Sequence, residues 1–120
     1  MSERKPLREF FTKVVGVTYS NEDGTSRQHI IAKCKEGEDM LLEWQPNNRY
    51  DSNAVAVRRR KTDKQIGFLA RDVAERLVEQ IEAGKQFSAE IHRIHGGGFF
   101  SGESLGVVLK IGVYGPEPDV

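Results

Sequence analysis

Residues 46–57 have the sequence Pro46-Asn47-Asn48-Arg49-Tyr50-Asp51-Ser52-Asn53-Ala54-Val55-Ala56-Val57. Proline and asparagine favour turns, because the proline ring fixes φ and asparagine bonds to its own backbone. The alternating apolar residues that follow are typical of a strand. The stretch therefore predicts a loop that runs directly into a strand. Tyr50 and Asp51 stand at this junction, where a hydrophobic core requires neither of them, and this placement suggests recognition.

Strands are also predicted on both sides of this stretch. Upstream, alternation of apolar residues at positions 40, 42 and 44 predicts a strand that ends just before Pro46. Downstream, Gln65–Leu69 is a short apolar segment of strand character.

The period of the apolar residues changes after Leu69. Helical spacing of apolar residues predicts a helix over residues 71–83, with Gly84 placed to end it. Alternation then returns from Phe87, with a shift of phase that predicts a bulge near His92 or Arg93. Residues 105–113 show the clearest alternation in the chain and predict a last strand.

The N-terminal third predicts two further strands. Residues 10–20 are rich in β-branched and aromatic types, with one side of the pleat formed by Phe11, Val15, Val17 and Tyr19. Residues 28–35 are interpreted as a second strand whose inward face is either 30, 32 and 34 or 29 and 31. Residues 1–9 are expected to be a mobile lead-in and residues 116–120 a frayed end.

These elements favour a mainly β fold. Short strands with one late helix suit a small OB-like β-barrel of about six to seven strands, with one main helix at residues 71–83. A sandwich of this size would rarely devote so much of its length to a helix. The expected domain spans residues 10–115.

Composition limits the function classes. The chain has 120 residues, 38% of them hydrophobic, and its 18 basic and 18 acidic residues cancel. One core is expected, and any nucleic-acid binding must be local. The single cysteine, Cys34, excludes an intramolecular disulfide, and the polar start resembles no secretory signal. A cytoplasmic protein without a membrane partner is expected.

No catalytic, metal or cofactor signature emerges. His92 and His95 would point to opposite faces of a strand, so they form no zinc pair. Gly96, Gly97 and Gly98 lack the spacing of a dinucleotide fingerprint and favour a hairpin loop. Phe99 and Phe100 at its tip are either contact residues or an apolar anchor of the loop. A metal-dependent hydrolase built on Asp51 would need a second carboxylate at suitable spacing.

Aromatic and charged residues instead suggest a binding surface. Tyr19 and Tyr50 at strand ends are candidates for stacking on bases, although Tyr50 alone could be half-buried packing. The Asp51 carboxylate either caps a turn or accepts a hydrogen bond from a sugar hydroxyl, which would place it at a strand terminus. The basic run that ends the strand is either a solvated turn or a set of phosphate contacts, candidates being Arg58, Arg60 and Lys61.

Three segments together resemble the HIRAN domain, found in some fork-remodelling ATPases and as free-standing bacterial proteins. They are residues 14–19, Val-Val-Gly-Val-Thr-Tyr; residues 46–55, with the block Asn-x-Tyr-Asp-x-Asn-Ala-Val; and residues 66–69, Ile-Gly-Phe-Leu. The resemblance covers about residues 12–113. It implies an OB-like barrel that captures the 3′-hydroxyl end of single-stranded DNA.

The resemblance also implies roles for single residues. Tyr19 and Tyr50 would stack on terminal bases, Asp51 would accept the 3′-hydroxyl, and Arg71 at the helix start would contact phosphate. The remaining interface candidates are Thr18, Asn47, Asn48 and Phe68. Two of these depart from the DNA-binding members, because Thr18 stands where they have arginine and Phe68 where they have histidine.

Two main hypotheses follow. The first is a non-catalytic module that binds the 3′ end of single-stranded DNA in repair or fork processing, with a DNA-processing protein as a further partner. The second is a protein-interaction domain that has lost DNA binding, which the neutral net charge and Thr18 favour. The sequence does not decide between DNA and RNA.

Overall fold

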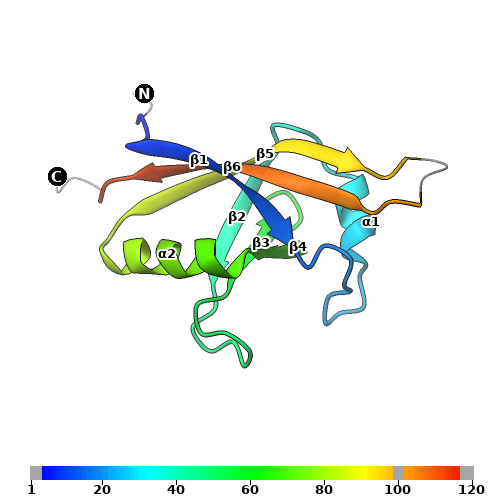
Figure 1. Cartoon of the computed structure of the whole chain (residues 1–120), viewed down its shortest axis with the longest axis horizontal. Helices are drawn as coiled ribbons and strands as arrows, with labels where there is room; N and C mark the ends of the chain where they lie inside the picture. The colour runs from blue at the N-terminus through cyan, green and yellow to red at the C-terminus, as the bar shows by residue number, and fades with distance from the viewer. Residues whose placement is uncertain (1–3, 99–101, 117–120) are drawn as a thin grey trace.

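The computed structural model describes residues 4–98 and 102–116, in which six strands close into a barrel (Figure 1). The elements in chain order are β1 (Arg8–Val15), α1 (Arg27–Ala32), β2 (Asp39–Trp44), β3 (Val55–Arg59), β4 (Gln65–Leu69), α2 (Arg71–Glu82), β5 (Gln86–Gly96) and β6 (Leu105–Tyr114). Around the barrel the order is β1-β4-β3-β2-β5-β6, and each neighbouring pair is antiparallel. The predicted mainly β barrel is confirmed, with six strands.

The two longest strands, β5 and β6, supply one wall of the core. Their inward-facing side chains are buried: Ala89, Ile91, Val107, Leu109, Ile111 and Val113. The register of the pair shifts between Ile91 and Arg93, so the predicted bulge is confirmed. The bulge changes which side chains of β5 face inward.

The predicted helix is also confirmed, as α2. It buries Ala74, Leu77 and Val78, which are three and four positions apart and so lie on one face. Ala83 caps the helix, and Gly84 follows with φ +86, a left-handed conformation that glycine adopts without strain. Arg71, at the start of α2, is therefore held next to the end of β4.

The strand predicted over residues 28–35 is wrong, because this segment forms α1. The Ser26 side chain accepts a hydrogen bond from the His29 N–H, the usual contact of a helix N-cap. Ile30, Ile31 and Cys34 are buried, and their spacing fits a helix rather than a strand. Neither of the two strand faces considered for this segment is therefore present.

The first strand was predicted too long and on the wrong face. It starts at Arg8, within the expected lead-in, and ends at Val15, because Gly16 turns the chain with φ +70. Val14 faces the core, whereas Phe11 and Val15 are exposed. Strand pairing decides which side chains of β1 face the core. β1 lies between β4 and β6, and the buried residues of these two strands fix the register of β1.

A buried ion pair joins β3 to the segment after α1. Arg59 contacts the Glu38 carboxylate and donates from Nη2 to the Lys33 carbonyl at 3.1 Å. Burial alone would raise the pKa of Glu38, but hydrogen bonds from Arg59 and from the Lys35 N–H lower it below its ordinary value. Arg59 belongs to the basic run for which a solvated turn and phosphate contacts were both considered, and it is thus a structural residue at the end of β3.

Some predictions lie outside the described residues. These are the roles of Phe99 and Phe100 and the behaviour of residues 1–3 and 117–120. Within the described ranges, neither helix is long and apolar enough to cross a lipid bilayer.

Candidate nucleic-acid interface

Two loops extend from the same side of the barrel in Figure 1, and they hold the two predicted tyrosines. One joins β2 to β3 and contains Tyr50. The other joins β1 to α1 and contains Tyr19. Both tyrosines are highly exposed, Tyr50 at 82% and Tyr19 at 69%. Large exposed rings on adjacent loops are available for stacking with bases.

The β2–β3 loop is closed at its base by hydrogen bonds. The Gln45 N–H donates to the Ala54 carbonyl at 2.8 Å, and the Trp44 indole N–H donates to the Ser52 carbonyl at 2.9 Å. The sequence predicted this loop because its turn residues stand between two strands. Its tip is therefore presented from a fixed base.

Asn48 organises the tip of this loop. Its side-chain oxygen accepts hydrogen bonds from the N–H groups of Tyr50 at 2.9 Å and Asp51 at 3.1 Å, and its Nδ2 donates to Gln45 Oε1 at 3.0 Å. Asn48 was predicted as a contact residue, but its carboxamide is engaged within the loop. It positions Tyr50 and Asp51, while Asn47 is exposed beside it.

The two carboxylate oxygens of Asp51 have different partners, one within the loop and one at the start of α2. Oδ1 accepts from the Asn53 N–H at 2.9 Å, and Oδ2 lies 3.3 Å from Arg71 Nε. The Asp51 side chain is 22% exposed and that of Arg71 is 77% exposed. The turn role and the recognition role considered from the sequence are compatible, because a carboxylate has about four acceptor positions. The terminal nitrogens of Arg71 make no hydrogen bond or ion pair with the described residues.

The Tyr19 loop is fixed by α1. The Tyr19 N–H donates to the Gly16 carbonyl at 3.3 Å, and Gln28 Nε2 donates to the Val17 carbonyl at 2.9 Å. Thr18, where an arginine was expected by resemblance, is exposed at the turn. The helix that sequence reasoning missed is thus the support of the first tyrosine.

Phe68 on β4 lies between the two loops. A Cβ atom placed on Gly16 would be 3.7 Å from Tyr19 Cδ2 and 3.9 Å from Phe68 Cδ2, so both rings flank this glycine. Phe68 also lines a cavity that Tyr50 borders. Tyr19 lies outside the lining of that cavity, so Phe68 is the ring that both flanks Gly16 of the Tyr19 loop and lines the cavity.

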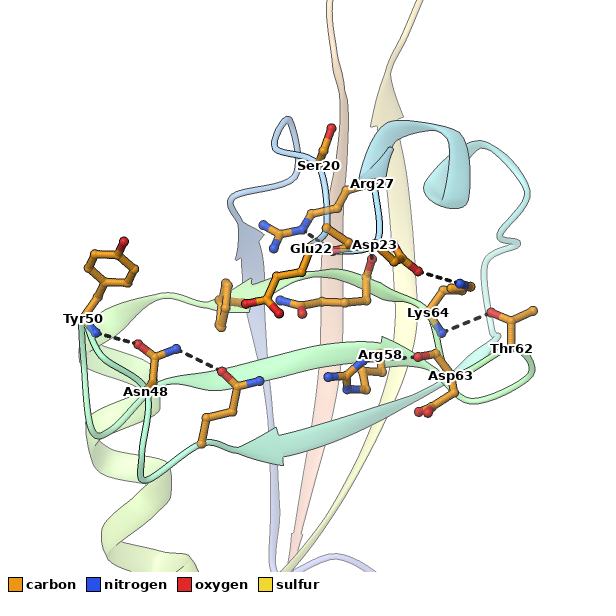
Figure 2. A pocket seen from close by; sticks show the side chains of 14 residues that line it. Ser20, Glu22, Asp23, Arg27, Asn48, Tyr50, Arg58, Thr62, Asp63 and Lys64 are labelled. Atoms are coloured by element: carbon orange, nitrogen blue, oxygen red, sulfur yellow. Dashed lines mark hydrogen bonds and ion pairs between the residues drawn. The ribbon is translucent and has the colours of Figure 1, made fainter. Parts of the chain in front are cut away.

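The cavity has a volume of about 600 Å³ and lies between Tyr50 and the loop of residues 20–23. Figure 2 shows Tyr50 at one edge, and Asp63 and Lys64 toward the opposite one. Its lining is mostly polar, with amide side chains from Asn21, Gln45, Asn48 and Gln65. Lys64 pairs with Asp23 at 2.8 Å. Hydrogen bonds from Lys64 and Thr25 hold the pKa of Asp23 well below its ordinary value.

The structure separates the predicted basic run. Arg58 lines the cavity but pairs with Glu43 at 3.1 Å. Arg60 lines a different cavity, beside Leu77 of α2, and Lys61 is exposed on the turn. Of the three candidate phosphate contacts, only Arg58 shares a cavity with Tyr50.

Sequence reasoning missed Arg27, a buried cation in the same cavity. Its Nε donates to Asn21 Oδ1 at 2.8 Å, and its Nη1 donates to the Gly16 carbonyl at 2.9 Å. Its guanidinium carbon lies 5.4 Å from the centre of the Phe68 ring. The helical spacing of Ser26, Ile30 and Cys34 was the one signal that could have placed Arg27 at the start of a helix.

Comparisons with known proteins agree on the fold. The crystal structure of the HIRAN domain of human HLTF superposes with a TM-score of 0.65 at 22% identity, covering 91% of this chain and 77% of that one. The crystal structure of a protein from Lactobacillus plantarum gives 0.62 at 17% identity, covering 85% of this chain and 91% of that one. No curated protein matches the chain in sequence.

Family membership rests on the sequence profile. The profile described as the HIRAN domain matches residues 7–97, which include both tyrosine loops, β4 and α2. The match spans well over half of the chain, and the OB-like barrel fits it. The chain belongs to the HIRAN domain family, a family of DNA-binding modules rather than of catalysts.

Proposed function

We propose that this protein binds single-stranded DNA by its 3′-hydroxyl end, as a non-catalytic module in DNA repair or replication-fork processing. The observation that carries the proposal is the pairing of an exposed ring with a carboxylate at the tip of one braced loop. Tyr50 is 82% exposed, and the neighbouring Asp51 has acceptor positions beyond its bonds to Asn53 and Arg71.

Charge explains why an end is preferred. A carboxylate repels phosphate but accepts a hydrogen bond from a hydroxyl, and an internal nucleotide of DNA has no free 3′-hydroxyl. Arg71, beside Asp51, is available to the phosphate that precedes the terminal sugar. Stacking on Tyr19, Tyr50 or Phe68 would add about 1 to 3 kcal/mol for each base.

The first test compares two oligonucleotides that differ only in a 3′-hydroxyl or a 3′-phosphate. The unaltered protein should bind the hydroxyl form more tightly by roughly tenfold or more, because a hydrogen bond to a charged group contributes about 1.5 to 3 kcal/mol. Fluorescence anisotropy measures both affinities. Equal affinity for the two ends would remove the end-recognition claim.

Asp51→Asn is the informative variant. The amide oxygen can still accept from the Asn53 N–H, so the loop is retained, whereas the charge next to the DNA end is lost. The preference for the hydroxyl end should shrink, and binding of the phosphate end should strengthen. Glu79→Gln, the same charge change at an exposed position of α2, should leave both affinities unchanged.

A second candidate function is protein interaction without DNA binding. The observation that favours it is the exposed face of β1, where Phe11 is 58% exposed and its ring lies 4.6 Å from that of His92. Salt dependence separates the two functions. Binding through phosphates weakens steeply as salt is added, and binding through an apolar face does not.

A further inference from the structure

Arg27 differs from the other buried arginine of the described chain in having no acidic partner. Arg59 is paired with Glu38, as buried charges normally are. The hydrogen bonds of Arg27 go to an amide oxygen and a backbone carbonyl, and both acceptors are neutral. Only 9% of Arg27 is exposed. A guanidinium stays protonated in proteins, so this is a buried positive charge without a counter-ion.

The N–H groups of Arg27 that make no described hydrogen bond face a cavity rather than the hydrophobic core. Five N–H groups are available on a guanidinium, and the described contacts use one on Nε and one on Nη1. Nη2 donates to no group within the described residues. Figure 2 shows the guanidinium directed toward the side of the cavity on which Tyr50 lies. A planar pair of donors on one edge of an arginine suits two oxygens of a phosphate.

The guanidinium is held in place before any ligand arrives. Asn21 and the Gly16 carbonyl fix one edge, and the Phe68 ring lies 5.4 Å from its carbon. Asn21 is itself anchored, because its Nδ2 donates to the Gln65 carbonyl at 3.0 Å. A charge fixed in this way loses little side-chain freedom when it binds.

We propose that the cavity between Tyr50 and residues 20–23 binds a backbone phosphate of the DNA strand, and that Arg27 is the residue that holds it. The assignment rests on the proposed function, and it adds a phosphate subsite beyond the 3′-terminal one beside Asp51 and Arg71. Arg27 would also supply a positive charge near the Tyr19 loop, where Thr18 stands in place of the arginine of the DNA-binding members.

The cavity also contains opposing charges. Asp23 is neutralised by Lys64, but Glu22 and Asp63 are exposed on the same lining, and neither makes an ion pair with the described residues. A phosphate on Arg27 would be repelled by the Glu22 carboxylate. Removing the Glu22 charge should therefore tighten DNA binding, in the direction opposite to removing Arg27.

The test uses single-stranded oligonucleotides with a 3′-hydroxyl and one neutral methylphosphonate linkage, moved along the last four linkages. The unaltered protein should lose affinity roughly 10- to 100-fold at one linkage beyond the terminal one, the effect of losing a charge-assisted hydrogen bond. Arg27→Gln should bind the normal strand more weakly by a similar factor and no longer respond to that linkage.

Two further variants keep the test decisive if Arg27→Gln folds poorly. Arg27→Lys retains the charge and should keep the salt dependence, whereas Arg27→Gln should reduce the slope of log K against log salt by about 0.7. Glu22→Gln should tighten binding of the normal strand and lose that gain when the same linkage is neutral.

The opposite results would overturn the assignment. If Arg27→Gln weakened every oligonucleotide equally and kept the response of the unaltered protein to each linkage, Arg27 would only support the Tyr19 loop. Unchanged affinity in Glu22→Gln would also contradict it. Failure of the unaltered protein to bind any strand would overturn the proposed function itself, and this assignment with it.

Discussion

At the scale of single residues, Asn48 shows how one side chain can position its neighbours from within a loop. Its carboxamide oxygen accepts two hydrogen bonds that fix the backbone of Tyr50 and Asp51, and its nitrogen donates a third to the Gln45 side chain. Sequence patterns identified the neighbouring pair Asn47 and Asn48 as turn residues with a possible contact role. The structure separates them, since Asn48 points into the loop and Asn47 is exposed.

We expect Asn48→Ala to weaken both stability and DNA binding. Two backbone N–H groups lose their acceptor, which should lower the free energy of unfolding by about 1 to 3 kcal/mol. Chemical denaturation and oligonucleotide titration measure the two effects. Asn47→Ala is the matched control and should leave stability unchanged. Equal stability of both variants would show that the loop does not depend on Asn48.

Residue type alone identified the candidates Tyr19, Tyr50 and Asp51, and their role in binding stays a prediction. Tyr19, Tyr50 and Asp51 stand out because rings and a carboxylate occur at strand ends, and both rings are exposed. Arg27 could not be identified in this way. It is a candidate because its buried guanidinium has no carboxylate partner among the described residues. That property depends on three-dimensional contacts and leaves no pattern in the sequence.

At the scale of elements, β3 to α2 could be predicted because their signals are local. Gly84 and the helical spacing define α2, and alternation defines the strands on either side of the Tyr50 loop. The segment of α1 was misread because Ile30, Ala32 and Cys34 also alternate. Packing against β4 and β6 decides between helix and strand here, and such tertiary contacts override local preference.

The junction of β4 with β1 gives a prediction at this scale. A Cβ atom on Gly67 would overlap the Val15 carbonyl oxygen and lie 2.7 Å from Val14 Cγ1. Gly67→Ala should therefore force β4 away from β1 and destabilise the fold by about 1 to 3 kcal/mol. It should also displace the adjacent Phe68 and weaken DNA binding.

Thermal unfolding with Gly115→Ala as the matched control would measure this effect. Among the described residues, a Cβ atom on Gly115 meets only Leu7 Cδ1, at an ordinary contact distance of 3.8 Å. That variant should unfold near the temperature of the unaltered protein. A Gly67→Ala variant as stable as this control would show that the two strands can separate without loss.

At the scale of the whole molecule, charge is distributed locally rather than as a broad field. The net charge is +0, and the cations Arg58, Lys64 and Lys110 are all paired with carboxylates. The barrel presents its two tyrosine loops on one side (Figure 1). We expect a neutral protein of this kind to recognise a particular feature of DNA rather than to coat a strand.

Competition by a DNA circle tests the central claim, recognition of a strand end, most directly. A labelled linear strand with a 3′-hydroxyl is displaced by an unlabelled strand of the same sequence, either linear or closed into a single-stranded circle. The account predicts that the linear strand competes and that the circle, which has no end, competes only weakly. Equal competition by the circle would contradict it.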